Sequence, residues 1–382
     1  MMSRKVNLAD MAASHARVEE PILKRTEAFF ASGMYMYGAD LLSCEKNLAR
    51  FVGAKHCICV SSGTDALIAI MMAAGIAQGD EVLTTPFTFY ATVSAMLVLG
   101  VKPVFVDIDP QSYLLDESQI ESKITARTKA IAPVSLFGQC PDFSKINEIA
   151  KKHQLLVIED SAQSFGATQS GEHSCHLSGV SATSFYPVKP LGCYGDGGAC
   201  FTDDDSLAEK IRMTREHGSK TKYLHEAQGL NFRMNTLQAI VVEERLKIFP
   251  SELEKRQWAA AEYSRLLEER NLASLLLPPK CLDGNTHAYA QYTIRLPKER
   301  DAVVEDLKAR GVGVAVHYPS VVYKQPAFLE KIPEAQDYSF PEAERAAAEV
   351  LSLPLHPYLS LEDIHYVVDQ LQEVLKAREI LK

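Results

Sequence analysis

Lys189 is the residue of this sequence whose setting best suits covalent chemistry. It stands between Pro187 and Pro190, and proline fixes its own backbone and restricts the residue before it. A glycine-rich turn at 195–198 and a short apolar run at 199–202 follow, so we expect Lys189 on a stiff loop between two strands. A lysine held there can condense with an aldehyde cofactor as a Schiff base. Taken alone, it could also be a solvated surface lysine, which is the commoner state of lysines.

A carboxylate at the end of a buried strand is the second candidate. Asp160 closes the apolar run 155–158, with Glu159 beside it. A carboxylate there can pair with a protonated ring nitrogen and so hold a pyridinium ring as an electron sink. Gln163, three residues on, could hydrogen-bond the phenolic oxygen of that ring, and Phe89 could stack on its face. Taken alone, Asp160 could also be a helix cap or a metal-binding acid, and Phe89 a core aromatic.

The segment 62–65, Ser-Gly-Thr-Asp, has the character of an anion site. It lies between a strand expected at 56–60 and a helix, where free backbone N–H groups and the helix dipole favour an anion, and Gly63 permits close approach. The pattern is neither a Walker loop nor GxGxxG, so it favours one phosphate over a dinucleotide. Ser184, on the strand that leads to the lysine, could add a phosphate contact. The alternative is an ordinary helix cap by Ser, Thr or Asp.

Alternating strands and helices must position these groups. They predict an α/β fold with a doubly wound, mostly parallel sheet and helices on both faces. In such sheets ligands bind beyond the carboxyl ends of the strands, which singles out the turns 61–65, 85–89 and 160–163. We expect strands at 56–60, 81–84, 103–108, 129–136 and 155–158, and helices following the first turn through residue 74 and at 88–99, 142–153 and 206–217.

We place a domain boundary near residue 250. Residues 1–250 are expected to form a large cofactor-binding domain that includes an N-terminal arm, and residues 251–382 a smaller α+β domain. A long helical region, 236–269, crosses this boundary and is expected to break near Pro250. Beyond it we expect strands at 291–296 and 312–316 and helices at 301–310, 341–350 and 361–377.

The composition is that of an ordinary soluble globular protein, with 47% apolar residues among 382. A net charge of −9 argues against a nucleic-acid or anionic-membrane surface. The longest apolar run, 66–77, is too short to span a bilayer, and we see no signal peptide. The eight cysteines are scattered and offer no metal-ligand spacing, so we expect no metal and reduced core thiols in a cytoplasmic protein.

In this order the motifs resemble those of fold-type I pyridoxal-phosphate enzymes and, more narrowly, the DegT-type nucleotide-sugar aminotransferases. The likeness covers nearly the whole chain and rests on Ser-Gly-Thr-Asp-Ala-Leu at 62–67, Phe-Thr-Phe-Tyr-Ala-Thr at 87–92, Ile-Glu-Asp-Ser-Ala-Gln at 158–163, Ser-Phe-Tyr-Pro-Val-Lys at 184–189 and Gly-Leu-Asn-Phe-Arg at 229–233. It implies pyridoxal 5′-phosphate as cofactor, with Lys189 and Asp160 as catalytic residues. The cofactor contacts that it implies are Gly63, Thr64, Asp65, Phe89, Asp160, Gln163, Ser184, Lys189 and Asn231, the last from a partner subunit.

Within the family, the chain is most similar to the branch that aminates C3 of UDP-2-acetamido-2-deoxy-3-oxo-glucuronate. That likeness rests on the segments 135–140, 189–195, 315–319 and 324–326. It implies that Arg233, His317 and Tyr318 contact the sugar and its carboxylate, and an arginine fork suits a carboxylate. The chain departs from the family pattern at Gly38-Ala39, where Gly-Pro is usual, and at the bulky Met36-Tyr37, so the exact sugar stays open.

The resemblance predicts an aminotransferase that takes an amino group, by family likeness from glutamate, and works as a homodimer with shared active sites. It also implies a role in cell-surface polysaccharides such as lipopolysaccharide O-antigen. Alternatives are C4 amination of a UDP- or dTDP-4-keto-6-deoxy sugar, a pyridoxal-phosphate sugar dehydratase, or a non-catalytic regulator. Dehydratase relatives carry histidine at the lysine position, and a regulator needs neither Lys189 nor Asp160. An NAD enzyme would need the missing glycine fingerprint.

Overall fold

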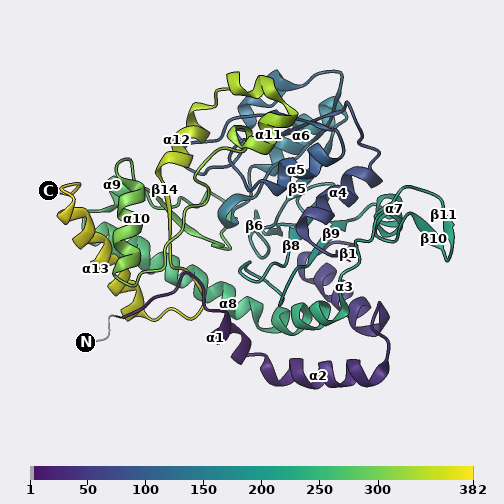
Figure 1. Cartoon of the computed structure of the whole chain (residues 1–382), viewed down its shortest axis with the longest axis horizontal. Helices are drawn as coiled ribbons and strands as arrows, with labels where there is room; N and C mark the ends of the chain where they lie inside the picture. The colour runs from purple at the N-terminus through teal and green to yellow at the C-terminus, as the bar shows by residue number, and fades with distance from the viewer. Residues whose placement is uncertain (1–3, 382) are drawn as a thin grey trace.

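A seven-stranded sheet forms the centre of the computed structural model, which describes residues 4–381 (Figure 1). Its strands are β1 (His56–Val60), β2 (Glu81–Thr84), β3 (Lys102–Phe105), β4 (Thr128–Ile131), β5 (Leu156–Asp160), β8 (Val180–Ser184) and β9 (Gly198–Thr202), in the order β1-β9-β8-β5-β4-β2-β3. Neighbouring strands from β3 to β8 are parallel, and β9 runs antiparallel to both of its neighbours. The predicted mostly parallel α/β sheet is confirmed.

Helices cover both faces of this sheet because its strands are apolar on both sides. In β1, Ile58 and Val60 pack with one set of helices while Cys57 and Cys59 pack with the other, as the period of two in a strand requires. The first set is α4 (Gly63–Ala73), α5 (Ala91–Val98) and α7 (Asp205–Arg215). The second includes α2 (Glu19–Ser32), α3 (Gly38–Val52), α6 (Phe143–His153) and the first half of α8 (Thr236–Glu269), and α1 (Met11–Ala16) precedes it in the N-terminal arm.

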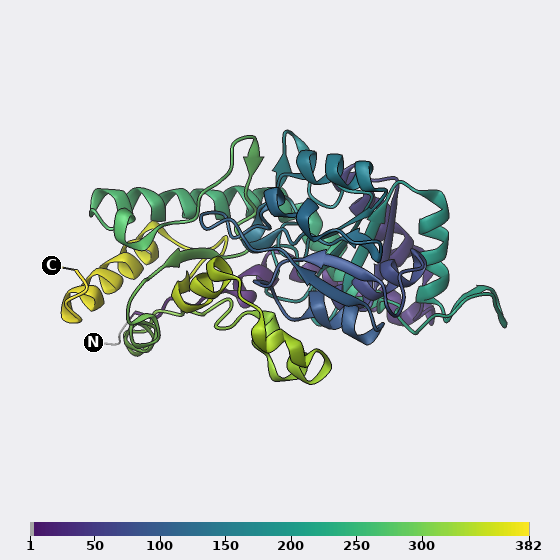
Figure 2. The ribbon, with the colours of Figure 1, turned by 90° about the horizontal axis from the view of Figure 1, so that it is seen from above.

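A second apolar core lies at the other end of the molecule (Figure 2). It is built from the second half of α8, α9 (Ala273–Leu276), β13 (Tyr292–Arg295), α10 (Arg300–Ala309), β14 (Val350–Leu353) and α13 (Leu361–Ala377). Residues 239–249 of α8 pack under the sheet, whereas residues 259–267 join this second core. We therefore propose that the division expected near residue 250 falls within α8.

Shorter elements complete the described chain. They are α11 (Pro326–Lys331), α12 (Pro341–Glu349), a small sheet of β6 (Thr168–Gln169), β7 (Glu172–His173) and β12 (Asn285–Thr286), and the hairpin of β10 (Ser219–Thr221) and β11 (Leu224–His225). Figures 1 and 2 both show this hairpin projecting from the body. Within residues 4–381, no helix is both long and apolar enough to cross a membrane.

Three expectations about local structure were wrong. α8 continues through Pro250, since buried residues on either side of it, Phe249 and Glu252, hold the helix against the body. The segment 312–316 is no strand, because it makes only single bridges, from Val312 to the N-terminal arm and from Ala315 to β14. Cys281 is exposed, whereas the other seven cysteines are buried thiols as expected.

Candidate active site

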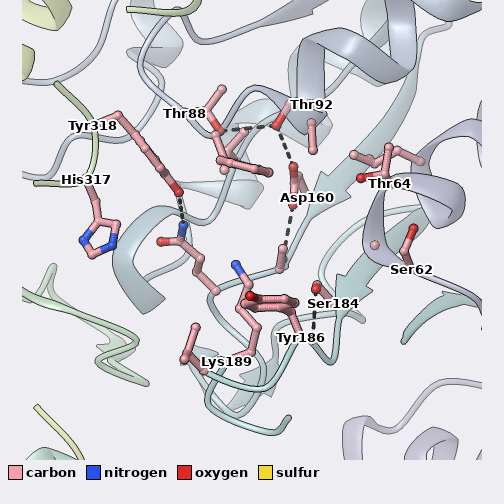
Figure 3. A pocket seen from close by; sticks show the side chains of 18 of the residues that line it. Ser62, Thr64, Thr88, Thr92, Asp160, Ser184, Tyr186, Lys189, His317 and Tyr318 are labelled. Carbon is pink, nitrogen blue, oxygen red and sulfur yellow. Dashed lines mark hydrogen bonds between the residues drawn. The ribbon is translucent and has the colours of Figure 1, made fainter. Parts of the chain in front are cut away.

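A cavity of about 400 Å³ opens at the carboxyl ends of β1, β2, β5 and β8 (Figure 3). The three turns that the sheet topology singled out, 61–65, 85–89 and 160–163, all contribute to its wall. The structure therefore brings together residues that are far apart in the sequence. Of the predicted site residues, Gly63, Thr64, Phe89, Asp160, Gln163, Ser184, Lys189, His317 and Tyr318 line the cavity, and Asp65, Asn231 and Arg233 do not.

Lys189 lies on the expected loop between β8 and β9. Its backbone N–H donates to the carbonyl of Tyr186 at 2.9 Å, and Arg245 Nη1 donates to the carbonyl of Gly192 at 2.6 Å, which ties the far side of the loop to α8. The side chain points into the cavity (Figure 3). Burial lowers the pKa of Lys189, and the charge of Asp160 only partly opposes this. A depressed amine pKa favours the neutral, nucleophilic form.

Asp160 closes β5 and is buried in the cavity wall. Its Oδ2 accepts a hydrogen bond from Thr92 Oγ1 at 2.7 Å, and its Oδ1 accepts a longer one, 3.2 Å, from the backbone N–H of Ala162. Burial raises the pKa of Asp160, and the bond from Thr92 counteracts this. A carboxylate oxygen has room for two hydrogen bonds, so Asp160 can still accept a proton-bearing nitrogen of a ligand.

The neighbouring Glu159 points to the opposite face of β5. Its Oε1 accepts from the hydroxyls of Ser135 and Ser174, both at 2.7 Å, and its Oε2 accepts from the backbone N–H of Cys175 at 2.8 Å. Burial raises the pKa of this carboxyl as well. Its donors are all supplied by the protein, so Glu159 fastens the strand end from behind, outside the cavity.

The turn before α4 has the geometry of a phosphate cradle. A helix leaves its first N–H groups without partners inside the helix, and Ser62 Oγ caps only that of Asp65, at 3.1 Å. A Cβ on Gly63 would lie 2.8 Å from Cβ of Ser184, so only glycine fits between this turn and β8. Asp65, unlike Gly63, does not line the cavity: its carboxylate accepts from Ser61 Oγ at 2.6 Å and secures the turn from outside.

The opposite wall is aromatic and polar. The side chain of Phe89 is 56% exposed, and its ring lies 5.8 Å from the ring of Tyr318. Gln163 is held at both ends: its Oε1 accepts from the N–H of Phe137 at 2.7 Å, and its Nε2 donates to the Tyr318 hydroxyl at 3.0 Å. Burial, with Lys189 nearby, lowers the pKa of His317 to about 4, so its imidazole is neutral at neutral pH.

Asn231 and Arg233 lie on the outer side of β1, away from the cavity of their own chain. The carbonyl between them, of Phe232, accepts from the N–H of Ser61, and Asn231 is exposed. Arg233 Nη1 donates to Glu216 Oε1 at 2.6 Å. In the described chain, residues 4–381, Lys189 is the only lysine or arginine that lines the cavity. An anionic ligand therefore meets no other fixed cation from this chain.

Sequence reasoning did not single out several lining residues. They are Ser62, Leu67, Thr88, Ala91, Thr92, Val134, Ala162, Tyr186, Val188, Asp196 and Gln291. All of these except Val134, Asp196 and Gln291 fall inside motifs that were recognised, so position within a motif was an available signal for them. Gln291 precedes β13, in the second core, and nothing in its sequence surroundings indicates a site.

The side chains around the cavity fit pyridoxal phosphate. A lysine amine of lowered pKa, a buried carboxylate with acceptor capacity left, a helix start shaped for an anion and an exposed aromatic face are the groups that such a ligand requires. These groups come from the ends of four strands, so no single sequence motif contains all of them. No part of it uses Asp65 or Glu159.

Comparison with known proteins agrees with this fit. Residues 16–372 match the profile of the DegT/DnrJ/EryC1/StrS aminotransferase family. The chain is 46% identical to a UDP-2-acetamido-2-deoxy-3-oxo-D-glucuronate aminotransferase of Pseudomonas aeruginosa, over 95% of this chain and 98% of that protein. It is also 41% identical to a pleiotropic regulatory protein of Geobacillus stearothermophilus, over 96% and 98%.

Two solved structures extend the likeness to the fold. A DegT DnrJ EryC1 StrS aminotransferase from Brucella abortus superimposes with a TM-score of 0.90 at 36% identity, covering 96% of this chain and 98% of that one. NtdA from Bacillus subtilis, with bound cofactor PMP, superimposes with a TM-score of 0.88 at 32% identity, covering 94% and 82%.

Proposed function

The chain belongs to the DegT/DnrJ/EryC1/StrS aminotransferase family, and from that premise we propose that it aminates C3 of UDP-2-acetamido-2-deoxy-3-oxo-glucuronate with glutamate as amino donor. It is a pyridoxal-phosphate-dependent sugar aminotransferase. The relative from Pseudomonas aeruginosa, which bears this substrate in its name, supports the choice of sugar. A relative from Acidithiobacillus ferrooxidans, 36% identical, is a UDP-N-acetyl-3-dehydro-alpha-D-glucosamine 3-aminotransferase and supports C3. The single observation that carries the chemistry is that Lys189 and Asp160 face one cavity.

We infer the following roles around the cofactor. When bound, pyridoxal phosphate supplies an aldehyde that exchanges amino groups and a ring that withdraws electrons. Lys189 would hold it through Nζ, and Asp160 would keep its ring nitrogen protonated. Gly63, Thr64 and Ser184 would bind the phosphate, with Phe89 against the ring and Gln163 at its phenolic oxygen.

Lys189 then acts as the proton carrier. Its free amine would accept at Nζ the proton that leaves the Cα of the amino donor, and the resulting ammonium would give that proton up again as general acid. Its lowered pKa suits the role of base, because at a given pH more of the amine is in the neutral form that can accept a proton. Donor and sugar use the same cavity in turn, so we expect ping-pong kinetics.

We propose a homodimer in which Asn231 and Arg233 complete the active site of the partner subunit. Two observations support it: neither residue lines the cavity of its own chain, and Lys189 is the only cation found there among residues 4–381. The cofactor carries a phosphate and the proposed sugar nucleotide a diphosphate and a carboxylate, all of which require donors or cations. His317 and Tyr318, which do line the cavity, would contact the sugar.

We also propose a cytoplasmic enzyme whose product enters a cell-surface polysaccharide such as lipopolysaccharide O-antigen. The eight cysteines are free thiols, which suits a reducing compartment. A nucleotide-linked sugar is an activated donor for glycan assembly, which suits the polysaccharide role. A purely regulatory role, suggested by the Geobacillus relative, would leave the Lys189 and Asp160 pair without a use.

The experiment that tests this function presents the purified protein with pyridoxal phosphate, glutamate and a panel of keto UDP- and dTDP-sugars. Mass spectrometry of the products should show one oxygen replaced by an amino group, with the 3-oxo-glucuronate as the preferred acceptor. Preference for a 4-keto-6-deoxy sugar would contradict the substrate. Loss of oxygen without gain of nitrogen would indicate a dehydratase. If no sugar gave a product, the regulatory alternative would be favoured.

A further inference from the structure

A chain of polar contacts holds Arg233 in place on the outer side of β1. Glu216, at the end of α7, accepts from Arg233 Nη1 through Oε1 at 2.6 Å. Its other oxygen, Oε2, accepts from the hydroxyl of Tyr37. Both oxygens of Glu216 are therefore engaged, one by the arginine and one by the tyrosine.

Two further contacts hold Tyr37 in place, one to its ring and one to its backbone. The guanidinium carbon of Arg215 lies 5.5 Å from the centre of its ring, and Arg215 Nη1 donates to Glu45 Oε1 at 2.6 Å in the core. The carbonyl of Tyr37 accepts from Thr236 Oγ1 at 3.3 Å. Its φ of +61° lies in the left-handed region, which a bulky residue occupies only when its surroundings hold it there.

These contacts orient the Arg233 side chain but leave some of its N–H donors without a partner. Glu216 takes Nη1, and Nε is buried without a hydrogen-bond partner in the described part of the chain. An arginine carries five N–H donors, so a pinned guanidinium can still offer an open edge to a second carboxylate. A free arginine would lose side-chain freedom on binding, and one that is already held loses less.

We propose that Glu216, braced by Tyr37, is the positioning residue that orients Arg233 toward the carboxylate of the uronic sugar. The inference rests on the proposed function, because it needs a carboxylated acceptor and an Arg233 that serves the partner's cavity. Tyr37 belongs to the Met36-Tyr37 segment at which the sequence departs from the family pattern. The departure thus becomes a specificity element of this chain.

The test separates the two half-reactions of the enzyme. In Glu216→Ala holoenzyme, the conversion of the cofactor by glutamate should stay within about twofold of wild type, since no sugar is present. The KM for the 3-oxo-glucuronate should rise about tenfold or more, the loss expected for one charge-assisted hydrogen bond. A matching keto sugar without the carboxylate should show little change. Tyr37→Phe should shift the same KM in the same direction by a smaller factor.

A double-mutant cycle shows whether Glu216 acts through Arg233. Adding Glu216→Ala to an Arg233→Ala protein should cost nothing further if the effect passes through the arginine. Glu216→Gln, which keeps an acceptor oxygen, should recover part of the affinity. Glu209→Ala is the matched control, since it removes an exposed ion pair with Lys220 from α7 and should leave the KM unchanged.

The outcomes are distinct. An unchanged KM in Glu216→Ala, a full penalty on the Arg233→Ala background, or equal slowing of both half-reactions would each overturn the positioning role; equal slowing would indicate collapse of the segment instead. Failure of the wild-type enzyme to aminate the carboxylated sugar would overturn the proposed function first, and this inference with it.

Discussion

Lys189 and Arg233 are held by different parts of the fold. Lys189 faces a cavity and has no ion pair with any described residue, whereas the charge of Arg233 is already paired. Lys189 and Asp160 lie at strand ends in a shared cavity, half-buried or buried, with both pKa values displaced by burial. Arg233 lies outside β1 and is already paired with Glu216. With the roles proposed above, the difference teaches that one chain would preform the groups for proton transfer, while the arginine proposed for substrate recognition is held on another surface.

A second contrast, within β5, sharpens the first. Glu159 and Asp160 are adjacent buried carboxylates, but the protein supplies three short hydrogen bonds to Glu159 and leaves acceptor capacity on Asp160. The pleat of the strand sends the two side chains to opposite faces. The same chemical group thus fastens the strand end on one side and faces the cavity on the other.

The largest expected effect is that of Lys189→Ala. Removing the amine takes away both the covalent anchor and the proton carrier, so we expect kcat to fall by about 10³-fold or more. Single-turnover conversion with glutamate measures it, and an unchanged thermal unfolding midpoint shows that the fold survives. Normal turnover by this variant would refute the assignment of Lys189.

Asp160→Asn should mainly lower activity, whereas Glu159→Gln should mainly lower stability. Asp160→Asn keeps the size of the side chain but removes the charge, so kcat should fall by about 10²- to 10³-fold with little change in stability. Glu159→Gln places an amide against three donors and should lower the free energy of unfolding by about 1–3 kcal/mol. Urea titration and single-turnover rates measure both. An equal loss of rate in the two variants would contradict the different roles given to Asp160 and Glu159.

Arg233→Ala should weaken recognition without slowing the chemistry. We expect the KM for the carboxylated sugar to rise about 10- to 100-fold, while the half-reaction with glutamate is unaffected. Arg265→Ala provides the control, because it removes a guanidinium from exposed ion pairs on α8 and should leave the KM alone. A fall in kcat with an unchanged KM would place Arg233 in the chemistry.

The smallest effect concerns acid stability and His317. Its pKa of about 4 in the folded protein lies below the ordinary value near 6.5 of an unfolded histidine, so the unfolded state binds more protons between these pH values. Stability should therefore fall as the pH drops through this window, and His317→Gln should lose roughly 1–3 kcal/mol less there than wild type. Unfolding midpoints at pH 7 and pH 4.5 measure it, with the exposed His225→Gln as control. If wild type, His317→Gln and His225→Gln lost the same stability between pH 7 and pH 4.5, the account of a partly buried, neutral His317 would be contradicted.

Much of the fold followed from the sequence because its strands are short, apolar and closed by recognisable turns. The residues 56–60 and 81–84 form strands with the predicted bounds, and the loop that holds Lys189 lies where two prolines and a glycine turn suggested. The unbroken helix at Pro250 was unpredictable, since packing on both sides outweighed the local preference of proline.

The site was less predictable wherever a role depends on contacts between distant segments. Thr92, in α5, donates to Asp160 at the end of β5, and Glu216 links Tyr37 to Arg233. The spacing of residues along the sequence carries no signal for contacts between segments so far apart. The orientation of Asp65 was unpredictable for a related reason: the motif placed the residue at the phosphate turn, but only the structure shows that its carboxylate accepts from Ser61.

Mixing a protein that lacks the catalytic amine with one that binds the sugar weakly tests most directly whether recognition comes from the partner. Lys189→Ala and Arg233→Ala subunits, unfolded and refolded together, should form hybrid dimers in about half of the molecules, each with one intact site that combines Lys189 of one chain with Arg233 of the other. At low sugar concentration, the mixture should regain about a quarter of wild-type activity. Activity no higher than the mean of the two parents would show that Arg233 serves its own chain, and would contradict the account.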